Sequence, residues 1–224
     1  MMHLCAMDFI PFRRLPLVFV CVLLAAVASA QDSGALLSRL SNKAKSYGSI
    51  DARYASVLTD KASKFTANQA GRIRITGSKF FLELGDYTVI SNGTQVWTYE
   101  KATNDCMIDD MASLNEEGIN PAKLFTIWED DFRHEWKGRT TVAGRSVAVI
   151  HLYPKKANSR PFHTIQLYID EAKLEIVRAV VKGREGTDVQ YDVKEFRTGV
   201  TLDPKLFTFD KARYPGVKVV DNRL

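Results

Sequence analysis

The sequence is poor in cysteine and histidine, on which many metal sites and nucleophilic catalytic centres depend. It contains three cysteines and four histidines in 224 residues. Cys5 and Cys21 lie near the N-terminus, which leaves Cys106 as the one thiol after residue 30. A single cysteine cannot form an internal disulfide, so the hydrophobic core alone has to stabilise the fold. The histidines after residue 30 do not stand at zinc-ligand spacing with Cys106 or with carboxylates, so the sequence predicts no metal and no cofactor.

Long hydrophobic runs are also missing, except for one near the N-terminus. Two arginines precede an apolar run over residues 15–28, which ends in a small-x-small triplet. This order is typical of a cleaved secretory signal, and the run is shorter than the ~20 residues that a bilayer span requires. Residues 1–30 are therefore predicted to be a signal peptide, starting at Met1 or Met7, and residues 31–224 a single exported domain. A retained membrane anchor is the alternative.

Basic residues are not arranged for nucleic-acid binding. The formal net charge is +5, but lysines and arginines do not alternate with aromatic residues as in a nucleic-acid groove, so no nucleic-acid partner is expected. Acidic residues are concentrated between Ala102 and Phe132, where eight acids accompany one base, Lys123. This segment is either a solvated helix face or a docking site for a basic partner.

Hydrophobic periodicity predicts one helix followed by many strands. Leu36, Leu37 and Leu40 stand at helical spacing in a helix that Asp32 or Ser33 can cap and that Gly48 ends. Alternation of period two then predicts short strands about ten residues apart, which favours an antiparallel sheet with sequential pairing. The predicted strands lie at residues 50–54, 72–75, 80–84, 87–90, 95–99, 133–141, 146–153, 162–170, 175–182 and 187–196.

The strand pattern breaks at about residues 105–130, where a helical lid insertion is predicted. Its two short helices are Asp105–Leu114 and Pro121–Glu129, and Asn120 can cap the second. A sheet of nine or more strands tends to curl and needs cover on its faces. The first helix is expected to cover one face and the apolar side chains of the insertion the other.

Motifs for bond chemistry are weak. The segment Gly144-Arg145-Ser146 lacks the second glycine of a nucleophile elbow and opens a strand. The acidic pair Asp109-Asp110 would diverge on a helix, and the loop 183–186 is too short to hold a phosphate. The sequence therefore predicts that the protein is not an enzyme. A lipid hydrolase that uses Ser146 is an alternative, which Ser146→Ala would test.

Five segments together match the pattern of a known family. Gly71–Ile75 leads into Lys79–Glu83, and Val89–Tyr99 contains an Asn-Gly pair that favours a type I′ hairpin. The chain closes with Phe207-Thr208-Phe209 and then Tyr214–Asp221. In this order, the segments resemble the periplasmic outer-membrane lipoprotein carrier protein family (LolA-like) over nearly all of the chain after the signal, from about residue 35 to residue 223.

The resemblance implies a mainly β fold with some α, an incomplete antiparallel β-barrel (half-barrel) with a helical lid over an apolar cavity. Family members take lipoproteins from an inner-membrane ABC-type lipoprotein-releasing complex and carry their acyl chains to an outer-membrane acceptor. We therefore expect a monomeric periplasmic carrier of lipoprotein acyl chains, or of a related lipid, that performs no bond chemistry. The alternative is a non-transporting sensor or interaction module with the same fold.

The residues expected to contact acyl chains lie on the strands after Gly71 and in the lid insertion. They are Ile73, Ile75, Phe81, Trp97, Ile108, Met111, Leu114, Leu124, Phe125 and Trp128. Ordinary core packing is the alternative for Phe81 and Trp97, and Phe207 and Phe209 are expected to be structural.

One feature departs from the family pattern. The best-known members carry a lid-locking arginine on the strand after the Gly71 position, where this chain has Thr76-Gly77-Ser78. Arg74 lies two or three residues away, so the role is not transferred to it.

Overall fold

A computed structural model describes residues 33–117, 120–129, 132–156 and 160–223. The predicted signal peptide, residues 1–30, lies outside the described residues. The N-terminal helix occupies residues 33–45. The strands are β1 (Ile50–Asp60), β2 (Phe65–Thr76), β3 (Lys79–Leu84), β4 (Tyr87–Ser91), β5 (Gln95–Glu100), β6 (Asp105–Asp110), β7 (Phe132–Val142), β8 (Arg145–Pro154), β9 (Phe162–Asp170), β10 (Glu175–Gly183), β11 (Thr187–Thr198) and β12 (Lys218–Asp221).

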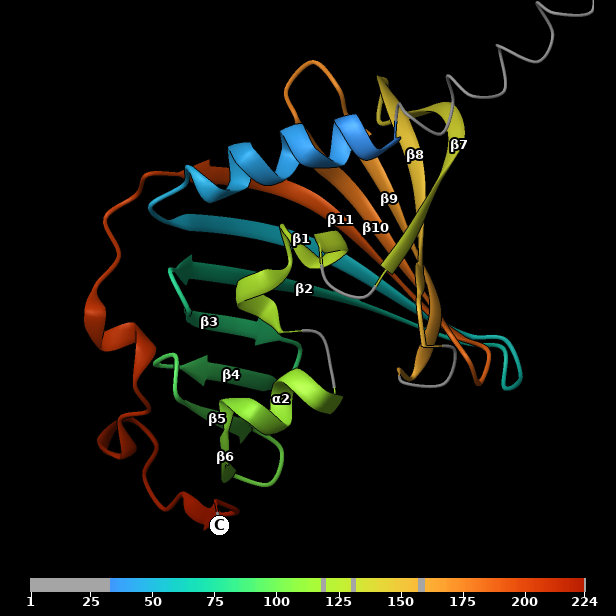
Figure 1. Ribbon diagram of the computed structural model, residues 1–224. Coiled ribbons are helices and arrows are strands. Elements are labelled where there is room, and N and C mark those ends of the chain that lie inside the picture. Colours follow the sequence, from blue (N-terminus) through green and yellow to red (C-terminus); the bar gives the residue numbers. More distant parts are fainter. Residues whose placement is uncertain (1–32, 118–119, 130–131, 157–159, 224) are drawn as a thin grey trace, which may run out of the picture.

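All twelve strands form one sheet in the order β12-β6-β5-β4-β3-β2-β1-β11-β10-β9-β8-β7. Neighbours are antiparallel except for β12, which runs parallel to β6. The sheet curls without closing, and within the part of the chain that the structure describes β12 and β7 are its edges (Figure 1). The predicted half-barrel with sequential antiparallel pairing is confirmed. The pairing of β1 with β11 joins two meanders, β1–β6 and β7–β11.

The insertion differs from the prediction in its first part. Asp105–Asp110 is strand β6 and not helix, because Cys106 and Ile108 share one hydrophobic cluster while Met107 between them is exposed. Cys106 and Ile108 pair with Tyr99 and Trp97 of β5. The helical part comprises α2 (Met111–Glu117) and two short 3₁₀ helices, η1 (Pro121–Lys123) and η2 (Ile127–Glu129). Asn120 caps η1 as predicted, since its side chain accepts a hydrogen bond from the Ala122 amide. We call residues 111–117 and 120–129, which contain α2, η1 and η2, the lid segment.

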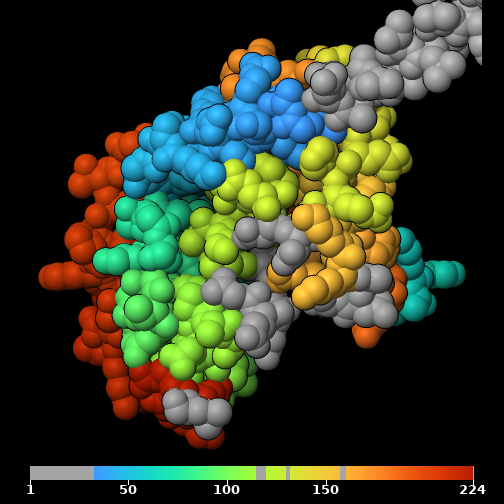
Figure 2. Space-filling view, in the orientation of Figure 1, coloured from blue at the N-terminus to red at the C-terminus, as the bar shows by residue number. Residues whose placement is uncertain are grey.

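The N-terminal helix and the lid segment both lie within the curve of the sheet (Figure 1). We call the concave face of the sheet, on which they lie, the inner face and the opposite face the outer face. The expectation that helix and insertion cover opposite faces is therefore wrong. Figure 2 shows the yellow-green lid segment beneath the blue helix, between the green strands of the first meander and the yellow and orange strands of the second.

A C-terminal segment, residues 199–217, covers part of the outer face instead. It contains the 3₁₀ helices η3 (Pro204–Phe207) and η4 (Lys211–Arg213). Phe209, Tyr214 and Val217 pack there against Trp97 and Cys106. The ring centroids of Tyr99 and Tyr214 are 4.3 Å apart. Phe207 is 2% exposed, which agrees with a structural role. Because this segment covers β3–β6, these strands carry apolar residues on the outer face as well, such as Ile90, Trp97 and Cys106.

No helix in the described ranges is long and apolar enough to cross a membrane.

Candidate functional site: the inner face and its lid

The first half of the inner face is an apolar surface with the lid segment packed on it. Its buried residues come from β1, β2 and β3, namely Ile50, Ala52, Ile73, Ile75 and Phe80. The lid segment packs against them with half-buried apolar side chains, namely Met111, Leu114, Ala122, Leu124 and Phe125. The rings of Phe125 and Phe196 of β11 are 5.3 Å apart. Contacts of this kind are non-directional, so this part of the lid can repack around a flexible apolar ligand.

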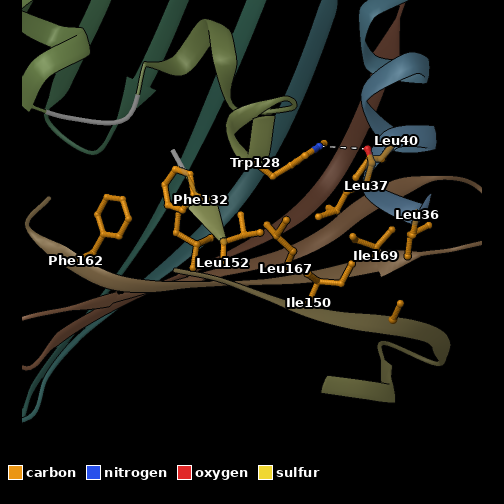
Figure 3. Close-up of a cluster of buried hydrophobic side chains, with 12 residues drawn as sticks. Leu36, Leu37, Leu40, Trp128, Phe132, Ile150, Leu152, Phe162, Leu167 and Ile169 are labelled. Carbon is orange, nitrogen blue, oxygen red and sulfur yellow. Dashed lines mark hydrogen bonds between the residues drawn. The ribbon is translucent and has the colours of Figure 1, made fainter. Parts of the chain in front are cut away.

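The second half of the inner face lies beneath the N-terminal helix. Leu36, Leu37 and Leu40 project from the helix toward β8 and β9 (Figure 3). Trp128 of η2 belongs to the same cluster and is 6% exposed. Its indole N–H donates hydrogen bonds to the Leu37 carbonyl, at 3.2 Å, and to the Ser41 hydroxyl, at 2.7 Å. The lid segment is thus tied to the N-terminal helix by directional bonds at Trp128.

A second contact between lid and helix is exposed. The Lys45 ammonium lies 2.7 Å from the Glu129 carboxylate, and both side chains are more than a third exposed. Such pairs contribute about 0–1 kcal/mol. The enclosed bonds of Trp128 therefore hold the lid more firmly than this ion pair does.

The structure divides the ten predicted contact residues between the two faces. Seven lie on the inner face or in the lid segment: Ile73, Ile75, Met111, Leu114, Leu124, Phe125 and Trp128. The other three, Phe81, Trp97 and Ile108, point to the outer face, where they belong to the cluster under the C-terminal segment. These three are therefore left out of the candidate site.

The turn Thr76-Gly77-Ser78, where the family arginine is missing, connects β2 to β3. Arg74 points to the outer face, where its guanidinium lies over the Phe81 ring at 5.0 Å and reaches the Glu83 carboxylate at 3.4 Å. Arg74 therefore does not bond to the lid segment.

Sequence reasoning missed two tyrosines on the inner face. Tyr54 of β1 and Tyr191 of β11 are half-buried, and their rings meet edge to face at 5.7 Å. The Tyr54 hydroxyl donates a hydrogen bond to the Glu83 carbonyl at 2.8 Å. Its ring passes over Gly71, where a Cβ atom would lie 2.3 Å from the ring. The alternation of Ile50, Ala52 and Tyr54 would have placed Tyr54 on this face, since alternate residues share one side of a strand.

Charged residues of the central strands are paired on the outer face. Asp51 accepts two hydrogen bonds from Arg72, both at 2.7 Å. Hydrogen bonding to Arg72 is the main cause that holds the pKa of the Asp51 carboxyl below its usual value. Farther along, the Asp188 carboxylate lies 2.8 Å from Lys182 and 2.9 Å from Lys61. These pairs keep the charges of β1, β2 and β11 away from the apolar inner face.

The outer face also carries a small polar cleft of about 220 Å³. Its lining includes Val57 and Thr59 of β1 and the Lys182–Asp188 pair. The cleft lies on the face opposite the lid, so it is not part of the candidate site.

Side chains suited to metal or thiol chemistry do not converge in the described ranges. No group of three or more His, Cys, Asp or Glu residues is placed there to hold a metal ion. Cys106 is fully buried on the outer face, and burial raises the pKa of its thiol to about 11. The thiol is therefore protonated at neutral pH and a poor nucleophile.

Comparison with known proteins gives one family match. The family model described as "Outer membrane lipoprotein carrier protein LolA" matches residues 46–210. A search of curated proteins finds no match.

Several solved structures are similar to this chain at low sequence identity. A conserved protein from Thermus thermophilus, described as uncharacterized, has a TM-score of 0.53 at 13% identity, over 85% of this chain and 99% of that chain. A putative outer membrane lipoprotein-sorting protein domain from Vibrio parahaemolyticus has a TM-score of 0.45 at 12% identity, over 80% and 97%. A LolA superfamily protein from Nitrosomonas europaea has a TM-score of 0.40 at 11% identity, over 81% and 98%. The first likeness shows a shared fold.

Proposed function

The chain belongs to the outer membrane lipoprotein carrier protein LolA family, and on that premise we propose that it is a periplasmic carrier of lipoprotein acyl chains or of a related lipid. It binds the chains between the inner face and the lid segment and shuttles them from the inner to the outer membrane. It acts as a monomer and performs no bond chemistry. Its proposed partners are an inner-membrane ABC-type lipoprotein-releasing complex and an outer-membrane acceptor.

One observation carries this proposal: the inner face is apolar over both of its halves, and its cover is made of separate helical pieces. Burying an acyl chain is worth ~0.8 kcal/mol per CH₂ group, so a lipid with several chains requires tens of kcal/mol of shelter outside a membrane. A wide apolar face under a detachable cover supplies this shelter. Individual hydrogen bonds contribute far less.

The contacts of the lid suggest how loading works. The side chains of Met111, Leu114 and Phe125 meet the sheet through apolar packing, and acyl chains can replace such packing at little cost. Trp128 is held by hydrogen bonds to the N-terminal helix. We therefore propose that α2 and η1 part from the sheet first and that the full opening that admits acyl chains breaks the hydrogen bonds of Trp128 to the N-terminal helix.

The decisive test is native mass spectrometry of residues 31–224 purified from a bacterial periplasm, with lipid extraction alongside. Near-stoichiometric lipoprotein or lipid would support the carrier and identify its cargo. A clean apo mass that persists when acylated peptide or lipid is added would refute the carrier and favour the non-transporting interaction module.

A matched pair of substitutions locates the binding surface in the same experiment. Phe125→Glu places a charge between the lid and the sheet, so the co-purifying lipid is expected to be lost. Phe65→Glu makes the same change at a hairpin tip, where Phe65 is 57% exposed, and lipid is expected to be retained. Equal retention by both variants would exclude the space under the lid.

A further inference from the structure

Three connections between strands meet at one end of the sheet. β2 pairs with β3 only from Gly71 onward, so the hairpin of β1 and β2 projects past β3 (Figure 1). The Lys61 amide in this hairpin donates a hydrogen bond to the Gly186 carbonyl in the hairpin of β10 and β11, at 3.3 Å. The Arg184 guanidinium of that second hairpin donates to the Arg160 carbonyl, between β8 and β9, at 3.0 Å. The three connections therefore form one continuous surface.

This surface is basic. We call it the basic tip, and it comprises residues 60–66, 155–156, 160–161 and 182–188. It contains seven basic and three acidic residues, so it accounts for most of the formal net charge of +5 that the whole chain carries. Lys64, Lys155, Lys156 and Arg184 are exposed. A concentration of one sign of charge on one surface attracts partners of the opposite sign.

Two of the three acids in the basic tip are engaged in contacts of their own. The Asp60 carboxylate accepts hydrogen bonds from two amides of its own turn, at 2.9 and 3.0 Å. Asp188 is 8% exposed, and its carboxylate lies 2.9 Å from Lys61 and 2.8 Å from Lys182. The charge that the basic tip presents to solvent is therefore mainly positive.

An aromatic side chain stands at the end of the basic tip. Phe65 is 57% exposed, the most exposed large hydrophobic side chain in the part of the chain that the structure describes. It directly follows the exposed Lys64, and the teal tip of its hairpin projects from the body of the molecule in Figure 2. An apolar ring surrounded by lysines and arginines is typical of groups that anchor proteins at a membrane interface.

We propose that the basic tip docks the protein on a membrane surface rich in anionic phospholipids, with Phe65 inserted among the headgroups. Lysines and arginines near such a surface are attracted to it, and the ring adds apolar burial at the boundary of the acyl chains. A bilayer accepts a projecting ring without a matching pocket, which favours a membrane over an acidic protein as the partner. None of the described residues of the basic tip belongs to the apolar clusters of the inner face, so docking goes beyond the proposed carrier function and does not depend on it.

Co-sedimentation with vesicles tests the proposal. The protein should bind vesicles of equimolar phosphatidylglycerol and phosphatidylcholine more tightly than vesicles of phosphatidylcholine alone, and salt should weaken this binding by screening. Lys64→Asn removes one exposed charge, and asparagine tolerates the φ of 56° at this position. It should weaken binding to the anionic vesicles about fivefold. Phe65→Ser removes the ring and should weaken binding about tenfold.

The matched control is Lys205→Asn, which makes the same change at an exposed residue of the C-terminal segment and should leave vesicle binding unchanged. Equal binding of the unmodified protein to both kinds of vesicle would overturn the proposal. Equal losses in Lys64→Asn and Lys205→Asn would also overturn it, because net charge and not the basic tip would then be the cause. Tighter binding to soluble polyglutamate than to anionic vesicles would favour an acidic protein as the partner and overturn membrane docking.

Binding of acylated peptide in solution separates docking from the carrier function. Phe65→Ser should bind the peptide as tightly as the unmodified protein does, because Phe65 lies outside the clusters of the inner face. Peptide binding without vesicle binding in the unmodified protein would overturn docking and leave the carrier in place. Vesicle binding without peptide binding would support docking and refute the carrier.

Discussion

The hydrogen bond between Trp128 and Ser41 should control how readily the lid opens. Both side chains are nearly fully buried, at 6% and 2% exposure, and the donor–acceptor distance is 2.7 Å. Ser41→Ala removes this bond but leaves the Leu37 carbonyl as an acceptor for the indole. We expect a loss of about 1 kcal/mol in the free energy of unfolding.

The same change should alter ligand affinity in the opposite sense. If the closed lid excludes cargo, the apparent dissociation constant is the intrinsic one divided by the fraction of open protein. Weakening the closed state by about 1 kcal/mol raises that fraction about fivefold while the open form remains minor. Ser41→Ala should therefore bind acylated peptide about fivefold more tightly although it is less stable. Urea unfolding and fluorescence titration measure the two quantities.

A double-mutant cycle with Trp128→Phe isolates the bond from the loss of ring volume. The coupling energy between the two positions is expected to be about 1 kcal/mol. Lys45→Met removes only the exposed ion pair with Glu129 and should change each quantity by less than about 1 kcal/mol. A coupling energy near zero, or a fall in stability with no gain in affinity, would refute the idea that this bond restrains the lid.

Further predictions concern the two faces and the central strands. Ile108→Ala, on the outer face, should lower the free energy of unfolding by about 2 kcal/mol and leave the lipid affinity of the folded protein unchanged. Phe125→Ala, in the lid segment, should weaken lipid binding. Equal losses of binding in the two variants would contradict the assignment of these residues to different faces. Gly71→Ala should lower the free energy of unfolding by about 1–3 kcal/mol through overpacking, because the new Cβ would lie 2.3 Å from the Tyr54 ring. An unchanged melting temperature would argue against that contact. Asp51→Asn should cost about 2 kcal/mol at neutral pH. Because the pKa of Asp51 is lowered in the folded state, its contribution is present above the ordinary carboxyl pKa of about 4 and is lost as pH falls through the lower folded value. The gap between the two melting curves should therefore close in acid, and a constant gap would disprove the role of the charge.

The sequence alone predicts the positions of most strands, but not which face of the sheet their side chains point to. The strands after residue 132 were placed to within a few residues, because clear turns separate alternating segments. Phe81 and Trp97 each follow another apolar residue, Phe80 and Val96, whose side chain points to the opposite face. Such a pair does not reveal which face is inner, so the sequence wrongly predicts that Phe81 and Trp97 line the cavity. The answer depends on the C-terminal segment, which comes more than a hundred residues later and covers the outer face.

The sequence pattern also predicts the wrong element where helix and strand signals overlap. Asp105–Asp110 carries acidic residues next to a predicted helix, yet Cys106 and Ile108 alternate as in a strand and complete the outer cluster. The prediction that Trp128 faces the sheet agrees with the structure. Its hydrogen-bond partners on the N-terminal helix, however, lie far from it in the sequence. Partners of this kind follow from the tertiary structure and not from spacing.

The pairing of β1 with β11 has a consequence for how the protein folds. Ile50 pairs with Thr198, and the two strands remain paired to Asp60 and Thr187. Every other antiparallel pairing joins consecutive strands, so each meander can form from local contacts while this seam must close a very long loop. The seam should form last. Until then the two halves of the inner face belong to separate units, so a chain interrupted before β11 would expose apolar surface and be prone to aggregation or proteolysis.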